Sequence, residues 1–207
     1  MKIINRRLFK IKYGKMEEAA ALMKAEVEAF DVYKGPSRIY MPLFAPGEIL
    51  AVEWEYESLA EYESLWTIYG ARPASEVFLA KFGMLETGPH FNELRQLVAA
   101  NEVDGSKNTI AVRWVDNVKP GNWQGGQDVL AANVAEFVTP GGFAARLSMP
   151  EAGQFGEQTL EIEFVSLAGF EAALAEWSAR PTAAAYREKV KVGLREGGTT
   201  EVWRIYH

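Results

Sequence analysis

The sequence predicts an α+β protein made of two ferredoxin-like repeats, each with the element order β-α-β-β-α-α-β. Three short segments recur later in the chain, in the same order and at one constant offset. Ordered matches at one spacing indicate a duplication, because chance identities would not share an offset. The matching segments are Ser58–Glu63 with Ser166–Glu171, Ala71–Pro73 with Ala179–Pro181, and Arg38–Pro42 with Arg146–Pro150.

The first repeat is expected to span residues 1–100. In the segment from Met16 to Phe30, apolar residues recur at helical spacing. Glu48–Tyr56 alternates apolar and charged residues, which is typical of a strand. Ser58 is a predicted helix N-cap, and Pro73 suits the first turn of a further helix. The remaining predicted strands are Lys2–Ile11, Ser37–Phe44 and His90–Val98.

A polar linker, residues 101–108, precedes the second repeat, which is expected to span residues 109–207. The same patterns restart there, with turn residues between the apolar segments. Helical spacing is read over Val129–Val138, and two more helices are expected from Ser166 and Pro181. The strands expected here are Thr109–Asp116, Gly142–Met149, Gln158–Val165 and Thr199–Tyr206.

Composition excludes several classes of protein. The 207 residues include 22 basic and 28 acidic side chains, a net charge of −6. This balance argues against nucleic-acid partners and anionic membrane surfaces. Cysteine is absent, so disulfides, thiolate nucleophiles and zinc–thiolate sites are excluded. The N-terminus lacks the apolar region of a signal peptide, and no apolar run is long enough to span a membrane. A soluble cytoplasmic protein is therefore expected.

The Lys119-Pro120-Gly121 entry to the first helix of the second repeat and the two Arg-Pro helix entries carry a resemblance to a known superfamily. They resemble the dimeric α/β-barrel superfamily, in particular its tandem, NIPSNAP-like and antibiotic-biosynthesis-monooxygenase-like members. The resemblance covers nearly the whole chain. It implies that two ferredoxin-like sheets face each other and close a barrel, here within one chain.

Strand alternation predicts which side chains face the helices and which face the barrel interior. Leu50, Val52 and Trp54 are assigned to the helix side, as are their expected counterparts Leu160, Ile162 and Phe164, which match at a slightly larger offset. The charged and polar side chains left for the interior are Arg38, Tyr40, Glu53, Arg146 and Glu163.

Two interpretations of these residues stay open. They could form cross-strand ion pairs, since burying unpaired charges is costly. Alternatively, Glu53 or Glu163 could act as a catalytic base while Arg38 or Arg146 stabilises an anion. Tyr40, Trp114 and Trp203 would then line a ligand cavity, although tryptophans in a small barrel are also common core residues.

The resemblance to the small monooxygenases implies a barrel that binds a small aromatic molecule and acts as a cofactor-independent monooxygenase on an aromatic or polyketide-like substrate. The alternative is a non-catalytic, NIPSNAP-like binding or assembly protein with a filled barrel. No metal site is expected, because only His90 and His207 are present. No nucleotide, flavin or serine-hydrolase motif occurs, so no cofactor is predicted. Homo-oligomerisation stays open.

Overall fold

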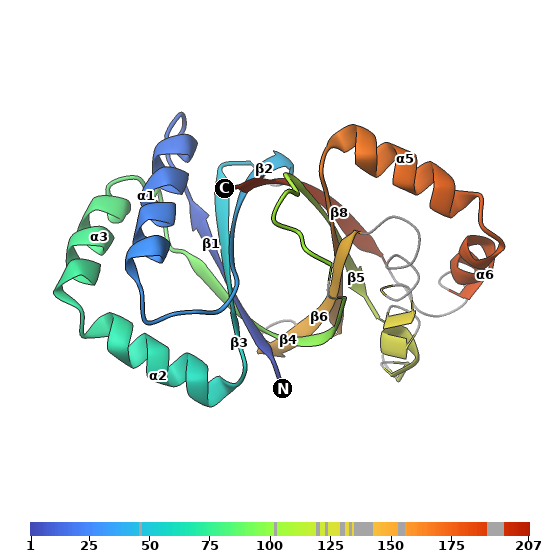
Figure 1. The fold of residues 1–207 in the computed structure, drawn as a ribbon, viewed down its shortest axis with the longest axis horizontal. Coiled ribbons are helices and arrows are strands. Elements are labelled where there is room, and N and C mark those ends of the chain that lie inside the picture. Colours follow the sequence, from blue (N-terminus) through green and yellow to red (C-terminus); the bar gives the residue numbers. More distant parts are fainter. Residues whose placement is uncertain are drawn as a thin grey trace. The chain divides into compact units, whose positions relative to one another are not determined.

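A computed structural model describes residues 1–45, 47–101, 103–118, 121–122, 124–128, 131–132, 134, 143–152, 156–189 and 197–207. Figure 1 shows its elements. In the first repeat these are β1 (Ile3–Lys10), α1 (Met16–Ala29), β2 (Ser37–Phe44), β3 (Ile49–Tyr56), α2 (Leu59–Gly70), α3 (Pro73–Gly83) and β4 (Phe91–Ala100). In the second they are β5 (Ile110–Asn117), β6 (Ala144–Ala152), β7 (Glu157–Phe164), α5 (Leu167–Ser178), α6 (Pro181–Lys189) and β8 (Gly198–Tyr206).

The hydrogen-bonded strands follow the order β1-β3-β2-β8-β5-β7-β6-β4 and close into a barrel. The predicted α+β class with a barrel of two ferredoxin-like repeats is therefore confirmed. The helix predicted over residues 129–138 lies mostly outside the described residues.

The chain divides into two compact units. Unit 1 comprises Met1–Gln96 together with Arg204–His207, and unit 2 comprises Leu97–Trp203. No helix among the described residues is long and apolar enough to cross a membrane.

Matching helix starts occur in the two units. The Ser58 hydroxyl accepts a hydrogen bond of 3.2 Å from the Glu61 N–H, and the Ser166 hydroxyl accepts one of 3.1 Å from the Gly169 N–H. Each bond satisfies a backbone donor that the first helical turn leaves free. Ser58 is thus the N-cap that the sequence predicts, and Ser166 caps the helix expected to begin there.

In unit 1, helices α1, α2 and α3 cover one face of the strands (Figure 1). Leu50 and Val52 of β3 and Ile39 of β2 are buried on that face, against Ala19 and Met23 of α1. Period-two alternation places these side chains together, and the apolar area they remove from water stabilises the unit. The assignment of Leu50, Val52 and Trp54 to the helix side is confirmed.

Unit 2 repeats this arrangement with different side chains. Leu147, Leu160, Ile162 and Phe164 are buried in its core, and Ala173 of α5 packs with them. The helix-facing assignment of the strand residues is confirmed here as well.

The hydrogen-bond registers correct one part of the repeat alignment. Arg38 lies opposite Glu53, and Arg146 lies opposite Glu161. The counterpart of Glu53 is therefore Glu161, and the expected match of Glu53 with Glu163 is wrong. A shift of two residues leaves every side chain on the same face, so alternation alone could not reveal the error.

Candidate functional site

The predicted site residues of unit 1 are engaged in ion pairs. The Arg38 guanidinium lies 2.6 Å from Glu55, and the Arg6 guanidinium lies 2.6 Å from Glu53. The Arg6 and Glu53 side chains are only 1 % and 3 % exposed. Tyr40 is buried beside them, and its hydroxyl donates a hydrogen bond of 3.4 Å to Glu53. Glu53 is thus held by two neighbours, and sequence reasoning missed Arg6 as its partner.

In unit 2, Arg146 donates two hydrogen bonds to one oxygen of Glu161, at 2.9 and 2.6 Å. Arg113 of β5 lies 3.2 Å from Glu161 and 3.1 Å from Glu201. The indole N–H of the buried Trp203 donates to Glu201 at 3.0 Å. These side chains form one connected network, in which Arg146 and Trp203 are two of the predicted site residues.

Glu163 and Trp114 lie elsewhere. Glu163 is buried on β7, opposite Ala111 and Ala144 in the neighbouring strands. Trp114 packs in the core of unit 2, with its ring centroid 6.2 Å from that of Phe170 in α5. Since side chains alternate along β5, Arg113 and Trp114 face opposite sides, and the prediction that Trp114 lines the interior is wrong.

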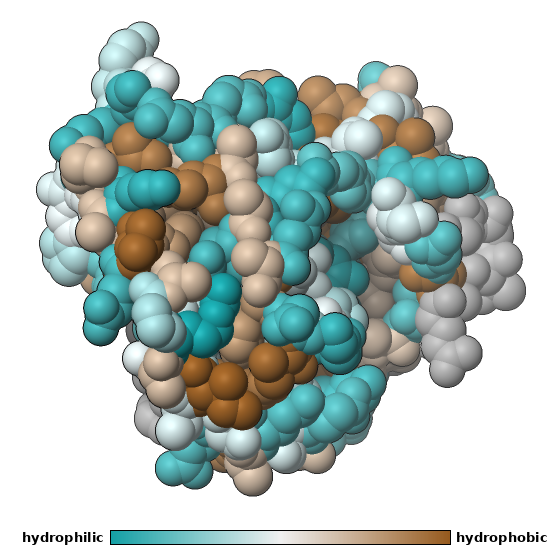
Figure 2. All heavy atoms as spheres, turned by 60° about the vertical axis from the view of Figure 1, so that its left-hand side comes forward, coloured by the Kyte–Doolittle hydropathy of each residue, from teal (hydrophilic) through white to brown (hydrophobic). Residues whose placement is uncertain are grey.

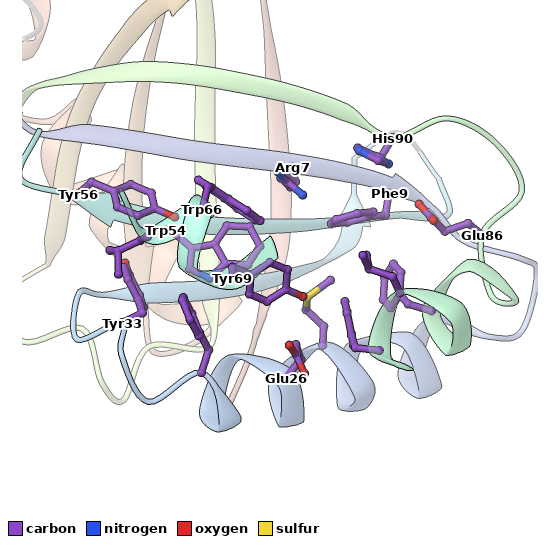
Figure 3. A pocket seen from close by; sticks show the side chains of 16 residues that line it. Arg7, Phe9, Glu26, Tyr33, Trp54, Tyr56, Trp66, Tyr69, Glu86 and His90 are labelled. Atoms are coloured by element: carbon purple, nitrogen blue, oxygen red, sulfur yellow. The ribbon is translucent and has the colours of Figure 1, made fainter. Parts of the chain in front are cut away.

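The described structure contains a different cavity in unit 1, between its strands and its helices (Figure 3). The cavity has a volume of about 80 Å³. One end carries Glu86 and His90, and the other carries Tyr33, Trp54 and Tyr56 (Figure 3). The aromatic residues that line it are Phe9, Phe30, Tyr33, Trp54, Tyr56, Trp66, Tyr69, Phe78 and Phe82.

Local periodicity explains why these side chains converge. Arg7 and Phe9 are two residues apart on β1 and therefore share its helix-facing side. Trp66 and Tyr69 are three residues apart on α2 and therefore lie on one face of that helix. Their ring centroids are 5.2 Å apart. Figure 2 turns this side of unit 1 forward and shows apolar groups set among hydrophilic ones.

Arg7 is one of the polar residues that line this cavity, and it lies between Trp66 and Phe9 in Figure 3. Its guanidinium carbon lies 3.9 Å from the centroid of the Trp66 ring. This geometry is a cation–π contact. The Arg7 Nε is buried and has no hydrogen-bond partner. Burial lowers the pKa of the guanidinium, and the nearby phenol groups of Tyr62 and Tyr56 oppose that shift.

Other titratable groups in the cavity feel the same apolar surroundings. Burial raises the pKa of Tyr56 and raises that of Tyr69 to about 12, so both are neutral phenols at neutral pH. Burial also raises the pKa of Glu86, with His90 opposing the shift, and its Oε1 is buried without a hydrogen-bond partner. Glu26 is paired with Arg72 at 3.1 Å.

Sequence reasoning missed this cavity, although one signal was present. Arg7 occupies the same side of β1 as the buried Phe9, so a charged residue stands on a face that the pattern assigns to the core.

Among the described residues, no cluster of His, Asp or Glu side chains could hold a metal ion.

Comparisons with known proteins agree on the fold. No model of a known protein family matches the sequence, and no curated protein matches it. A solved structure of a candidate monooxygenase from Fusobacterium nucleatum superposes with a TM-score of 0.75 at 15% identity, covering 100% of this chain and 93% of that one. The chain has the dimeric α/β-barrel fold.

Two further structures of this barrel fold are similar over the whole chain. A candidate monooxygenase from Lactobacillus acidophilus superposes with a TM-score of 0.72 at 10% identity, covering 99% of this chain and 93% of that one. An anthrone oxidase-like protein gives a TM-score of 0.65 at 14% identity, covering 100% of this chain and 92% of that one. At these identities the similarity establishes the fold and leaves the reaction open.

Proposed function

We propose that the cavity of unit 1 binds a small aromatic molecule and that the protein oxygenates it with O₂, without a bound cofactor. The observation that carries the proposal is a cavity walled by aromatic side chains from β1, β3, α2, α3 and the segment that follows α1. Concave sites with apolar walls and a few convergent polar groups are the usual form of small-molecule sites. The monooxygenase and anthrone oxidase-like names among the similar structures support this class of reaction.

The size of the cavity limits the ligand. Its volume is enough for a handful of water-sized spheres and no more. One aromatic ring is at the limit of this enclosed volume, so a second fused ring would extend through the side of the cavity that is open to solvent. Rings of this size can stack on Trp66 and Tyr69, and edge-to-face contacts with the other rings would fix their orientation.

A two-ring phenol provides a balanced test reaction. 1-Naphthol and O₂ give 1,4-naphthoquinone and water, so one oxygen atom enters the ring and the other leaves as water. The ring supplies the electrons that reduce O₂, and no further reductant is needed. The apolar walls would exclude bulk water from the bound phenol and so strengthen the electrostatic interactions around it.

The experiment incubates the protein with 1-naphthol under ¹⁸O₂, with the quinone measured by absorbance and its label by mass spectrometry. We expect quinone carrying one ¹⁸O, formed faster than in the absence of protein. Leu65→Trp, which places an indole in the cavity, is expected to abolish the acceleration. The control is Leu174→Trp, at an exposed position on α5. The proposal is refuted if the wild-type protein neither binds 1-naphthol nor converts it.

A second candidate function is NIPSNAP-like binding or assembly without catalysis. It is favoured by the ion pairs of Arg38, Glu53 and Arg146, which occupy the charged groups first expected to act on a substrate. In that case the wild-type protein would leave 1-naphthol unchanged, and light scattering on a gel-filtered sample would show an assembly larger than one chain.

A further inference from the structure

We propose that the cavity of unit 1 selects aromatic anions, whose negatively charged group binds to the guanidinium of Arg7. The inference rests on the proposed function only in requiring that an aromatic molecule binds in this cavity. The inference adds the charge of the ligand and the residue that recognises this charge.

Arg7 is fixed in position by its strand. It lies in the middle of β1, opposite Val52 of β3 on one side and Asn92 of β4 on the other. Its guanidinium is stacked on Trp66. Contact through the face leaves the N–H donors at the edge of the guanidinium, and the Nε donor there has no hydrogen-bond partner that a ligand would have to displace.

The charged groups around Arg7 do not neutralise it. Among the described residues, no carboxylate lies within ion-pair distance of its guanidinium. Two carboxyl groups line the same cavity, but Glu26 is paired with Arg72 and the surroundings of Glu86 include His90. The groups that act on the Arg7 charge are the phenol groups of Tyr62, Tyr56 and Tyr69.

Arg7 is half-buried, whereas the fully buried arginines of the described residues have carboxylate partners. Arg6, the next residue, is paired with Glu53, and Arg113 and Arg146 are both paired with Glu161. Even a half-buried cation without an anionic partner loses part of its hydration with no ion pair in return, because the protein interior solvates charge poorly. A carboxylate entering beside Arg7 would supply that partner, and a planar guanidinium can donate two parallel hydrogen bonds to it.

The second repeat shows the same position without a charge. The pair Arg6–Glu53 corresponds in register to Arg113–Glu161, so the residue that matches Arg7 is Trp114. Trp114 packs as a core residue against Phe170. The fold is therefore completed at this position by an apolar ring in one repeat, and the cation in the other repeat is not required by the architecture.

The experiment compares two probes of equal shape, 2-naphthoate and 2-naphthamide, by titration calorimetry. The wild-type protein is expected to bind the anionic naphthoate about ten-fold or more tightly than the neutral naphthamide, as a charge-assisted pair predicts. Arg7→Met, which keeps the length of the side chain, is expected to weaken naphthoate binding by about ten- to hundred-fold. Naphthamide binding should stay within about three-fold of wild type, since its contacts are apolar.

Two variants act as controls. Arg187→Met removes another arginine that lies over a tryptophan, at 5.5 Å from the Trp177 ring, but on the exposed helix α6 of unit 2. It should bind both probes as the wild type does. Arg7→Lys keeps the charge and should keep the preference for naphthoate, in a reduced form because lysine lacks the planar fork.

Each outcome decides one question. Equal affinity of the wild-type protein for the two probes overturns the inference and leaves the proposed function standing. Unchanged naphthoate binding by a folded Arg7→Met protein also overturns the inference. Binding of neither probe overturns the inference, and the 1-naphthol assay then decides separately whether the proposed function stands. If Arg7→Met does not fold, the wild-type comparison and Arg7→Lys still decide the question.

Discussion

Replacing Glu53 by glutamine tests whether this buried carboxylate has a structural role. Its oxygen lies 2.6 Å from the Arg6 guanidinium, and the two side chains are 3 % and 1 % exposed. At that distance and an effective dielectric constant of about 20, the attraction is roughly 6 kcal/mol. Glu53→Gln leaves Arg6 buried without a full counter-charge, and removing one partner of such a pair costs about 3–5 kcal/mol.

The assay is urea unfolding followed by tryptophan fluorescence, which gives the free energy of unfolding. Glu55→Gln is the matched variant, because the Glu55–Arg38 pair is partly exposed and should cost less to break. The double variant Arg6→Met with Glu53→Leu should recover much of the lost stability, since it removes both charges. A Glu53→Gln protein of wild-type stability that has lost 1-naphthol turnover would refute this reasoning and favour Glu53 as a catalytic base.

Three further predictions concern single positions. Ser58→Ala removes a helix N-cap and should lower the free energy of unfolding by about 1 kcal/mol in urea titrations, whereas the exposed Ser64→Ala should not. The pKa of Glu86 is raised, so ionising it opposes folding at neutral pH; Glu86→Gln should raise the midpoint of thermal unfolding at pH 7, and that gain should vanish below the ordinary glutamate pKa of 4.5. Gly35→Ala would bring a methyl group to 2.6 Å from the Glu55 carbonyl oxygen. It should cost about 1–3 kcal/mol in the same unfolding assay, and a wild-type value would contradict this steric argument.

The sequence predicted the architecture because repetition and alternation both survive in local patterns. The recurrence of Ser58 as Ser166 marked two equivalent helix starts, and both serines cap helices. Alternation along β3 separated Val52 from Glu53 correctly, since neighbouring residues of a strand face opposite sides. These features depend on residues close together in the sequence, which is why they could be read from it.

What could not be predicted depends on contacts between distant segments. Strand registers decide that Glu161 is the counterpart of Glu53, and a pattern of period two is unchanged by a shift of two residues. The cavity is formed by β1, β3 and all three helices of unit 1, and a sequence pattern does not state how closely helices approach a sheet. The sequence pattern therefore did not identify Arg7 as a residue of the cavity. It also did not identify Arg6 as the partner of Glu53, which is 47 residues away.

Comparison of the two repeats separates residues that the fold needs from residues that a ligand would use. The ion pair Arg6–Glu53 is present again as Arg113–Glu161, at the same register and with both side chains buried. Because this ion pair is present in both repeats, we infer that it has a structural role. Either charge alone would be strongly destabilising when buried between strands. The neighbouring position differs, with Arg7 in one repeat and Trp114 in the other. A position at which the same fold accepts either an aromatic ring or a cation is free of structural constraint on charge. The cation stacked on Trp66 in a ring-lined cavity is therefore the feature of this chain that an aromatic anion explains.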